Sequence, residues 1–354
     1  MNNDEAKYRV MIVEDSSVVR NLLGKIINET SDLNLIETAE NGRDAIDKIT
    51  NARPDILLLD VEMPVMDGLT ALPVLLNKSP DTKIIMVSTL TSHNARISIT
   101  ALEKGASDYL QKPSSNTVLD EFKKELLQKI YAIARKKPID ISYQSKVEQN
   151  DIEDNFKPEV LAIGSSTGGP QALATLFRGL PHSFNNVPIF LTQHMPPKFT
   201  TFLASSIENS SGRTCIEAKD GEHVKNGNIY IAPGDYHMLI KGKKDDLIIN
   251  LTQTDPENFC RPSVDPMLRS LVDIYGSNIL TVILTGMGQD GLLGSKKVVE
   301  NGGRVIIQDE ATSVVWGMPG AIAKAGIYHK MLPINQIASK IVEIFAKGGI
   351  KDGS

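Results

Sequence analysis

The sequence predicts an α/β protein made of two successive domains, each built on a mainly parallel sheet. Short apolar runs alternate with helical segments from residue 8 to about residue 135, and the alternation resumes after Pro158. Between them lies a polar, acidic stretch with few large apolar residues, typical of a linker. A chain of 354 residues is long enough for about two domains. We therefore expect domains at residues 7–135 and 158–347, joined by a flexible linker at 136–157.

The first domain is expected to be a (βα)₅ parallel sheet. Its β-rich runs, each short and apolar, are residues 9–13, 33–38, 55–59, 83–87 and 107–110. The segments between and after them carry apolar residues at helical spacing and are residues 18–28, 42–51, 69–77, 95–104 and 117–134.

The second domain is expected to be a doubly wound, mainly parallel α/β domain. The expected strands are residues 160–163, 189–192, 228–232, 279–284 and 304–307, and the expected helices are residues 171–178, 266–275 and 292–301. An antiparallel hairpin, residues 237–241 with 247–251, is expected to interrupt this pattern across the polar turn 242–246.

Composition excludes several classes of function. The net charge of −5, from 38 basic and 43 acidic residues, offers no broad basic surface for nucleic acid or anionic lipid. No apolar run approaches the roughly 20 residues that a membrane helix needs, and the acidic amino terminus does not resemble a signal peptide. We expect a soluble, cytoplasmic chain. The two cysteines, Cys215 and Cys260, are interpreted as ordinary reduced thiols.

Five polar side chains follow strands of the first predicted sheet and should meet at one edge: Glu14, Asp15, Asp60, Ser88 and Lys112. Three crowded carboxylates suit a hard divalent cation such as Mg²⁺. A carboxylate can act as a nucleophile toward a phosphoryl donor, and Lys112 would neutralise the developing charge. A single Asp at a loop start is usually only solvated, but five positions together favour a phosphorylation site.

These positions resemble the receiver domain of two-component response regulators. The resemblance is carried by Val13-Glu14-Asp15-Ser16, by Asp60-Val61-Glu62-Met63-Pro64 with Asp67-Gly68, and by Lys112-Pro113. It implies a flavodoxin-like fold, with Asp60 as phospho-acceptor and Glu14, Asp15 and Asp60 as Mg²⁺ ligands. It also implies Ser88 as the switch hydroxyl, Tyr109 as the switch aromatic and Lys112 as the phosphate contact.

In the second domain Gly164-Ser165-Ser166-Thr167-Gly168 matches G-x-S-x-G, the strand-to-helix turn that exposes a nucleophilic serine. A phosphate-binding loop is a rival interpretation, because backbone N–H groups at such a turn attract anions. A serine nucleophile needs a base and an orienting acid.

His194 is the best-placed base, because it follows the strand at 189–192 and should lie at the same sheet edge as Ser166. Asp290 stands in a Gly-rich turn after the strand at 279–284 and is the candidate acid. The order Ser, His, Asp differs from that of the α/β-hydrolases. His237 and Asp265 are rival members, but His237 lies inside a predicted strand and Asp265 is placed to be a helix N-cap.

The whole chain outside the linker resembles the chemotaxis protein-glutamate methylesterases, which are also protein-glutamine deamidases. The motifs are Ile163-Gly164-Ser165-Ser166-Thr167-Gly168-Gly169-Pro170, Gln193-His194-Met195-Pro196-Pro197, Ile231-Ala232-Pro233-Gly234, Arg261-Pro262-Ser263-Val264-Asp265, Leu284-Thr285-Gly286-Met287-Gly288 and Gln308-Asp309-Glu310-Ala311-Thr312-Ser313. The resemblance implies Ser166 as nucleophile, His194 as base and Asp290 as acid, with oxyanion donors near Thr167 and Met287. Ser165 stands where the family more often has Ala, so Ser165→Ala should be tolerated.

The expected function is a phosphorylation-activated hydrolase that demethylates glutamyl methyl esters and deamidates glutamines on methyl-accepting chemotaxis receptors, serving sensory adaptation. The implied partners are a chemotaxis histidine kinase as phosphodonor and the receptors as substrate, with no nucleic acid and no membrane insertion. Mg²⁺ is expected at the receiver site and no cofactor for the esterase chemistry. A non-enzymatic regulator with a ligand-binding second domain is the rival, and a DNA-binding output is disfavoured because no basic recognition helix is present.

Overall fold

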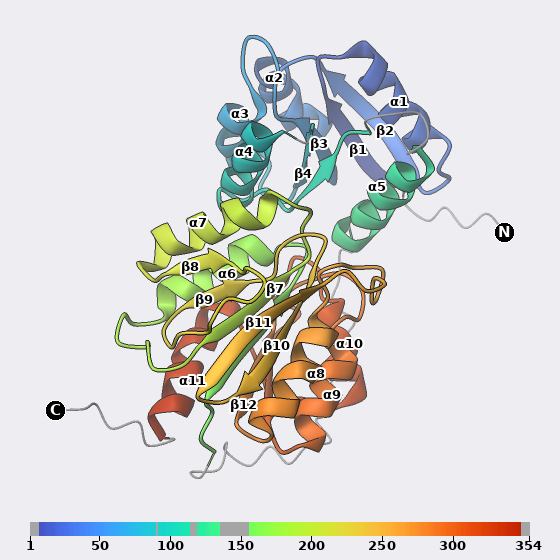
Figure 1. Cartoon of the computed structure of the whole chain (residues 1–354). Helices are drawn as coiled ribbons and strands as arrows, with labels where there is room; N and C mark the ends of the chain where they lie inside the picture. The colour runs from blue at the N-terminus through green and yellow to red at the C-terminus, as the bar shows by residue number, and fades with distance from the viewer. Residues whose placement is uncertain (1–6, 90, 114–118, 135–155, 348–354) are drawn as a thin grey trace. The chain divides into compact units, whose positions relative to one another are not determined.

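The chain folds as two α/β units, Met1–Lys137 and Pro138–Ser354, each with its own sheet. The computed structural model describes residues 7–89, 91–113, 119–134 and 156–347 (Figure 1). Both main sheets are parallel, and a separate antiparallel pair lies in the second unit, which confirms the predicted fold class. The predicted linker, residues 136–157, lies outside the described residues except for Phe156 and Lys157.

The first unit contains a five-stranded parallel sheet in the order β2-β1-β3-β4-β5. Its strands are β1 (Tyr8–Val13), β2 (Leu33–Ala39), β3 (Ile56–Asp60), β4 (Lys83–Ser88) and β5 (Asp108–Gln111). Strand β3 is buried along its whole length, as expected for an apolar strand with helices on both faces. Each predicted strand is present, and the ends differ by a residue at most.

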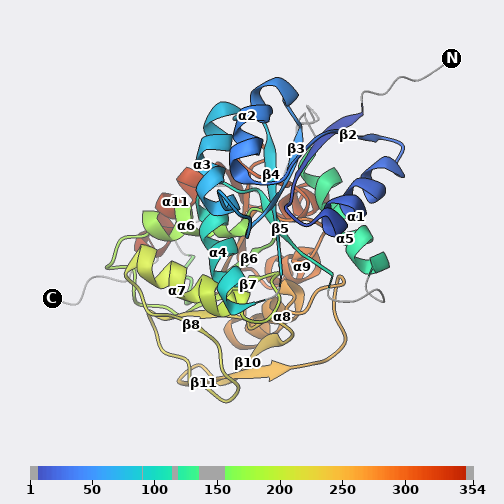
Figure 2. The same cartoon turned by 90° about the horizontal axis from the view of Figure 1, so that it is seen from above.

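Helices cover both faces of this sheet. They are α1 (Ser17–Asn28), α2 (Gly42–Ala52), α3 (Gly68–Lys78), α4 (Ser92–Glu103) and α5 (Leu119–Ala134). Figure 2 shows α2, α3 and α4 on one side and α1 and α5 on the other. Four of these helices begin at a side chain that accepts a hydrogen bond from the backbone N–H three residues later: Ser16, Asn41, Asp67 and Thr91.

The second unit contains a seven-stranded parallel sheet in the order β14-β13-β12-β6-β7-β9-β8. Its strands are β6 (Val160–Ser165), β7 (Ile189–Gln193), β8 (Cys215–Glu217), β9 (Ile229–Ile231), β12 (Ile279–Ile283), β13 (Arg304–Gln308) and β14 (Lys330–Leu332). The three neighbours β12, β6 and β7 are fully buried. Their carboxyl ends therefore lie together at one edge, beyond which the loops to the following helices begin.

Two groups of helices pack on the two faces of this sheet. Figure 1 shows α6 (Gly169–Gly179), α7 (Phe199–Ser211) and α11 (Ile334–Lys347) on one side of the sheet. On the other side lie α8 (Val264–Tyr275), α9 (Leu292–Glu300) and α10 (Met318–Ala325). The antiparallel pair β10 (His237–Lys243) and β11 (Asp246–Thr252) packs against α8, and its turn is tighter than predicted because Lys243 pairs with Asp246.

The structure also contains elements that the sequence patterns did not predict: β8, β14, α7, α10 and α11. The interpretation of Asp265 as an N-cap is wrong, because α8 begins one residue earlier and Ser263 holds the N-cap position. Among the described residues, no helix is both long and apolar enough to cross a membrane.

Candidate functional site

Ser166 lies in the turn that connects β6 to α6. Its backbone N–H donates to the carbonyl of Thr285 (3.0 Å), and its carbonyl accepts from Gly169 N (2.7 Å). Gly168 has φ +75°, a conformation that an L side chain rarely adopts, and a Cβ there would meet Val314 at 2.6 Å. The sequence Gly-Ser-Ser-Thr-Gly therefore folds as a tight strand-to-helix turn with Ser166 half-buried at its bend.

A second backbone turn lies beside this serine. A Cβ on Gly286 would be 2.8 Å from the Cβ of Ser166, so only glycine allows the two backbones to come so close. The Gly286 carbonyl accepts hydrogen bonds from Gly317 N (3.0 Å) and Met318 N (2.9 Å), which fixes the turn. Met287 is the next residue in this turn. The Thr285 hydroxyl also donates a hydrogen bond to the carbonyl of Thr167 (2.9 Å), which joins this turn to the serine turn. The two residues predicted to supply oxyanion donors, Thr167 and Met287, therefore lie one in each of these neighbouring turns.

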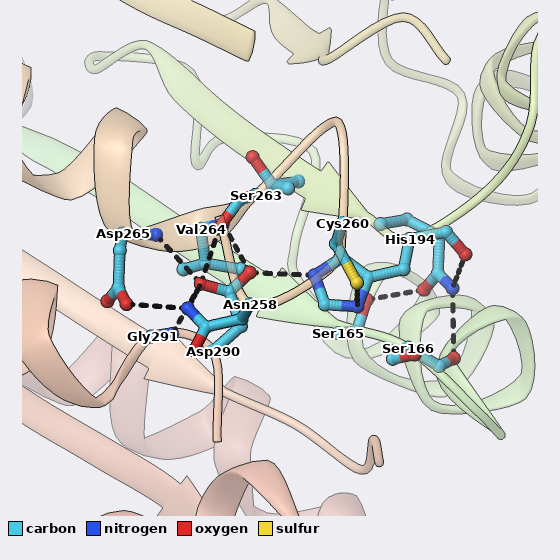
Figure 3. A network of polar contacts seen from close by, with 12 residues as sticks. Ser165, Ser166, His194, Asn258, Cys260, Ser263, Val264, Asp265, Asp290 and Gly291 are labelled. Carbon is cyan, nitrogen blue, oxygen red and sulfur yellow. Dashed lines mark hydrogen bonds and ion pairs between the residues drawn. The ribbon is translucent and has the colours of Figure 1, made fainter. Parts of the chain in front are cut away.

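His194 and Asp290 form a hydrogen-bonded pair. The Nε2 of His194 lies 2.7 Å from Oδ2 of Asp290. His194 directly follows β7, and its backbone N–H donates to the carbonyl of Ser165 (3.1 Å). Asp290 precedes α9 and is 1% exposed. Figure 3 shows His194, Asp290 and Ser166 converging from three loops at the sheet edge, so the structure brings the three predicted residues into one region.

The pair shifts the pKa of each partner. Burial opposes both charges and is the largest single influence, but the other contacts together outweigh it. Those with His194, Val264 N and Ser263 lower the pKa of Asp290, and those with Asp290 and Cys260 raise the pKa of His194. Since an ionised Asp290 only accepts hydrogen bonds, Nε2 of His194 carries a proton, and in the neutral imidazole Nδ1 is therefore the nitrogen with the lone pair. Nδ1 lies 3.4 Å from the sulfur of Cys260, a contact that nothing in the sequence indicated.

Ser166 and His194 are not hydrogen-bonded to each other in this conformation. Among the described residues, no hydrogen bond joins the Oγ of Ser166 to His194, whose two nitrogens face Asp290 and Cys260. Catalytic hydrogen bonds in ligand-free sites are often long and tighten only with substrate bound.

The rival residues have other roles in the structure. His237 is 1% exposed, its Nδ1 accepts from Ser263 N (3.2 Å), and its Nε2 faces the carbonyl of Asp255 (3.1 Å). Both ring nitrogens are therefore occupied by backbone groups. Asp265 lies in the first turn of α8, where Oδ1 accepts from Gly294 N (2.6 Å). Neither side chain contacts His194.

Gln193 joins the serine turn to the histidine strand. Its Nε2 donates to the carbonyl of Ser166 (2.9 Å) and to the carbonyl of His194 (3.2 Å), and its Oε1 accepts from the hydroxyl of Ser165 (2.6 Å). In the sequence, the only sign of this role is the position of Gln193 directly before His194 in a family motif. The role itself depends on a side chain that crosses from β7 to β6.

The acidic cluster of the first unit is present as predicted. Glu14, Asp15 and Asp60 each offer one carboxylate oxygen within 4.8 Å of the others. Lys112 lies between two of them, with Nζ 2.8 Å from Oε2 of Glu14 and 2.9 Å from Oδ1 of Asp60. Burial raises the pKa of Asp60 to about 6, although Lys112 works against this shift. A divalent cation would favour the ionised form further, and the all-oxygen donor set fits Mg²⁺.

The two predicted switch residues lie nearby in the same unit. Ser88 ends β4, is 2% exposed and has its Oγ 3.3 Å from the Oγ of Ser98 on α4. Tyr109 is on the adjacent strand β5 and is buried, with Nζ of Lys129 5.0 Å from its ring centroid. Lys129 also forms an ion pair with Asp108 (3.0 Å). Tyr109 is thus already turned inward here.

Two family models match the chain. Residues 161–341 match the CheB methylesterase model, and residues 10–122 match the response regulator receiver domain model.

Curated relatives match along nearly the whole chain. The protein-glutamate methylesterase/protein-glutamine glutaminase 1 of Paramagnetospirillum magneticum is 44% identical over 96% of this chain and 96% of its own length. The enzyme of the same name encoded by the group 2 operon of Rhodospirillum centenum is 44% identical over 96% and 94%. The crystal structure of the Thermotoga maritima CheB methylesterase catalytic domain is 43% identical and covers 53% of this chain and 99% of its own, with a TM-score of 0.51.

Proposed function

The chain belongs to the CheB methylesterase family, and we propose that Ser166, His194 and Asp290 catalyse hydrolysis of glutamyl methyl esters on chemotaxis receptors. The observation that carries the proposal is the His194–Asp290 pair beside the Ser166 turn at one sheet edge. The relatives are named for methylesterase and glutaminase activity, so both reactions are proposed for this chain.

In the first half-reaction the Oγ of Ser166 attacks the ester carbonyl while Nδ1 of His194 takes the hydroxyl proton. Asp290 stabilises the imidazolium that forms. Backbone N–H groups near Thr167 and Met287 stabilise the oxyanion. The imidazolium then returns the proton to the leaving methoxide, so that methanol departs and an acyl-serine remains.

In the second half-reaction His194 removes a proton from water, which attacks the acyl-serine carbonyl. Collapse of the tetrahedral intermediate breaks the bond to Oγ, and His194 reprotonates Ser166. The receptor then leaves the active site with a free carboxylate on its glutamate side chain. With a glutamine substrate the first leaving group is ammonia, and the remaining steps are the same.

We propose that the first domain, residues 7–135, regulates the second, residues 158–347, through phosphorylation of Asp60. Two observations support this proposal. Residues 10–122 match the receiver domain model, and one cluster brings together Glu14, Asp15, Asp60 and Lys112. Mg²⁺ held by the three carboxylates would neutralise charge on the transferred phosphoryl group. Lys112 contacts a phosphoryl oxygen, and Ser88 and Tyr109 respond to the modified Asp60. The phosphodonor is a chemotaxis histidine kinase, and the proposed location is the cytoplasm.

The decisive experiment is methanol release from methylated receptor membranes. Ser166→Ala removes the nucleophile, and because a triad acts as a unit we expect a loss of several orders of magnitude in rate. Circular dichroism should show unchanged folding, since the side chain is only half-buried.

The adjacent Ser165→Ala variant is the matched control. It removes a hydroxyl from the same turn and leaves Ser166 in place, so the rate should stay within about tenfold of wild type. Folded Ser166→Ala protein that released methanol at the wild-type rate would disprove the assignment of the nucleophile. The esterase activity would then need another nucleophile, whereas wild-type protein that released no methanol would favour the ligand-binding regulator.

A further inference from the structure

Asp290 receives hydrogen bonds on both carboxylate oxygens. Oδ2 faces Nε2 of His194 and also accepts from Val264 N (2.6 Å). Oδ1 accepts from four groups, which are the hydroxyl of Ser263 (2.7 Å), the N–H of Asp265 (3.1 Å), the N–H of Gly291 (2.9 Å) and Nδ2 of Asn258 (3.2 Å). Ser263, Val264 and Asp265 begin α8 and Gly291 adjoins Asp290 itself. Of the four groups on Oδ1, Asn258 supplies the only side-chain amide, and it comes from the turn that precedes α8.

A second buried carboxylate lies next to this one. Asp265 is 1% exposed, and its Oδ2 accepts from the same Nδ2 of Asn258 at 3.0 Å (Figure 3). One amide nitrogen therefore bonds to two carboxylates. Burial and then the charge of Asp290 raise the pKa of Asp265 to about 6, so the two acids oppose each other's ionisation.

The conformation of Asn258 is fixed by its own turn. Its φ is +53°, a left-handed conformation in which Asn is several-fold enriched among non-glycine residues. The turn is closed by hydrogen bonds between the backbones of Glu257 and Cys260 (2.9 and 3.2 Å). It is also anchored to α8 by the ion pair of Glu257 with Arg269. The amide is therefore held between the two acids before any substrate binds.

We propose that Asn258 is a positioning residue for the esterase reaction. By donating to both carboxylates it allows Asp265 and Asp290 to be buried side by side while Asp290 stays ionised and aimed at His194. This inference rests on the proposed function, because Asp290 orients the base. Asn258 itself does not touch the reacting atoms.

Two variants at position 258 distinguish a role as hydrogen-bond donor from a role in packing alone. Asn258→Ala removes the amide, and we expect kcat to fall about tenfold or more with KM within twofold, since the loss falls on the base and not on substrate contacts. Asn258→Asp keeps the shape but replaces a donor with a third acceptor. It should be slower than Asn258→Ala at pH 8, whereas a residue that only filled space would tolerate the isosteric change better.

The pH profile gives an independent readout. A protonated carboxyl at position 258 can donate again, so the ratio of Asn258→Asp to wild-type kcat should rise as pH falls from 8 to 6. The charged or titratable groups around this position are Asp265, Asp290, His194, Cys260, Glu257 and Arg269. Titration of these groups changes the kcat of the variant and of the wild type alike, so to a first approximation it cancels in the ratio of the two kcat values. A ratio that is flat with pH would overturn the proposal.

A second substitution at Asp265 tests whether the charge of this acid causes the defect of Asn258→Ala. Asp265→Asn removes one of the two opposed charges, and Asn258→Ala/Asp265→Asn should therefore be faster than Asn258→Ala alone. A double variant that is no faster contradicts the proposal. Asn250→Ala is the matched control, because the amide oxygen of Asn250 accepts a hydrogen bond from the exposed Lys241 on the hairpin, and this variant should retain wild-type kcat.

These outcomes distinguish failure of the positioning role of Asn258 from failure of the proposed esterase function. If Ser166→Ala is inactive while both Asn258 variants match wild type, only the positioning role of Asn258 fails. If Ser166→Ala is active, the proposed function fails first. Thermal unfolding of each variant identifies any loss of activity that follows from loss of the fold.

Discussion

At the residue scale, the chemistry depends on which nitrogen of His194 faces which partner. Asp290 contacts Nε2, so Nδ1 is the nitrogen that acts as the base in the proposed mechanism, and Cys260 is the side chain beside it. Burial lowers the pKa of His194, but the contacts with Asp290 and Cys260 together raise it, which favours the imidazolium that forms when a base takes a proton. In the neutral imidazole, the Ser166 hydroxyl would have to compete with this sulfur for the lone pair of Nδ1.

Substitution of the two histidines should separate their roles. His194→Ala removes the base and should cost about as much activity as Ser166→Ala, several orders of magnitude in rate. His237→Ala removes only contacts with the backbone at Asp255 and Ser263, so most activity should remain. The measurement is methanol release at equal enzyme concentration. Inactivation by the His237 change, with His194→Ala spared, would exchange the two assignments.

The sequence predicted the residues that stand at strand ends, and it could not predict those that support them. Ser166, His194 and Asp290 follow neighbouring apolar runs, so sheet topology brings them together. Asn258 lies in a segment with no periodicity and reaches Asp290 over 32 positions. Ser263 occupies an N-cap position yet donates its hydroxyl to Asp290. Such roles depend on side-chain direction, which a spacing pattern does not carry.

At the element scale, the helices and strands that the sequence predicts are mostly those that are long and regular. Strand β14 has three residues, and α10 begins with Met318-Pro319-Gly320, which is more typical of a loop. Helix α7 is rich in Ser and Thr, which are poor helix formers. Helix α11 is different, because Ile337, Ile341 and Ile344 are buried at helical spacing. That spacing is visible in the sequence and is typical of an amphipathic helix.

Helix α6 should be destabilised by Gly169→Ala, although Ala is the better helix former. A Cβ at this position would lie 2.0 Å from Oε1 of Gln193, the side chain that joins the serine turn to β7. Relief requires the Gln193 amide to move away from Ser165 and Ser166. We expect the free energy of unfolding of the second domain to fall by about 1–3 kcal/mol, together with reduced kcat.

Chemical denaturation and the esterase assay check this expectation. The control is Gly24→Ala inside α1, where a Cβ would meet only a methyl group of Leu35 at 3.3 Å, so the stability of the first domain should change little. An unchanged or higher stability of the Gly169→Ala second domain would show that Gln193 can be displaced at no cost.

At the scale of the whole molecule, the chain carries two sites built by one rule. In each domain parallel strands end in reactive side chains, Asp60 after four apolar residues of β3 and Ser166 after β6. The sequence predicted both sites because their strands are apolar and continuous. It could not predict how the proposed phosphorylation site would control the proposed esterase site, because the sequence at 136–157 carries no pattern from which a coupling between the domains could be inferred.

We expect the first domain to restrain the second until Asp60 is phosphorylated. Phosphorylation adds about −1.5 to −2 charge at a buried position that Lys112 already contacts, which favours rearrangement of the neighbouring strands and helices. A fragment of residues 157–354 should therefore release methanol faster than the unphosphorylated full chain. A small phosphodonor with Mg²⁺ should stimulate the full chain but neither the fragment nor Asp60→Asn.

All forms must be compared at equal concentration on one receptor preparation, because the receiver could instead act by docking the enzyme to its substrate. Docking predicts a fragment slower than the resting full chain on receptor membranes, whereas restraint predicts a faster one. A fragment that is no faster rules out restraint and leaves phosphorylation as the signal. Stimulation that survives Asp60→Asn is more damaging, since the phosphodonor would then act somewhere other than the carboxylate that Lys112 and Glu14 surround.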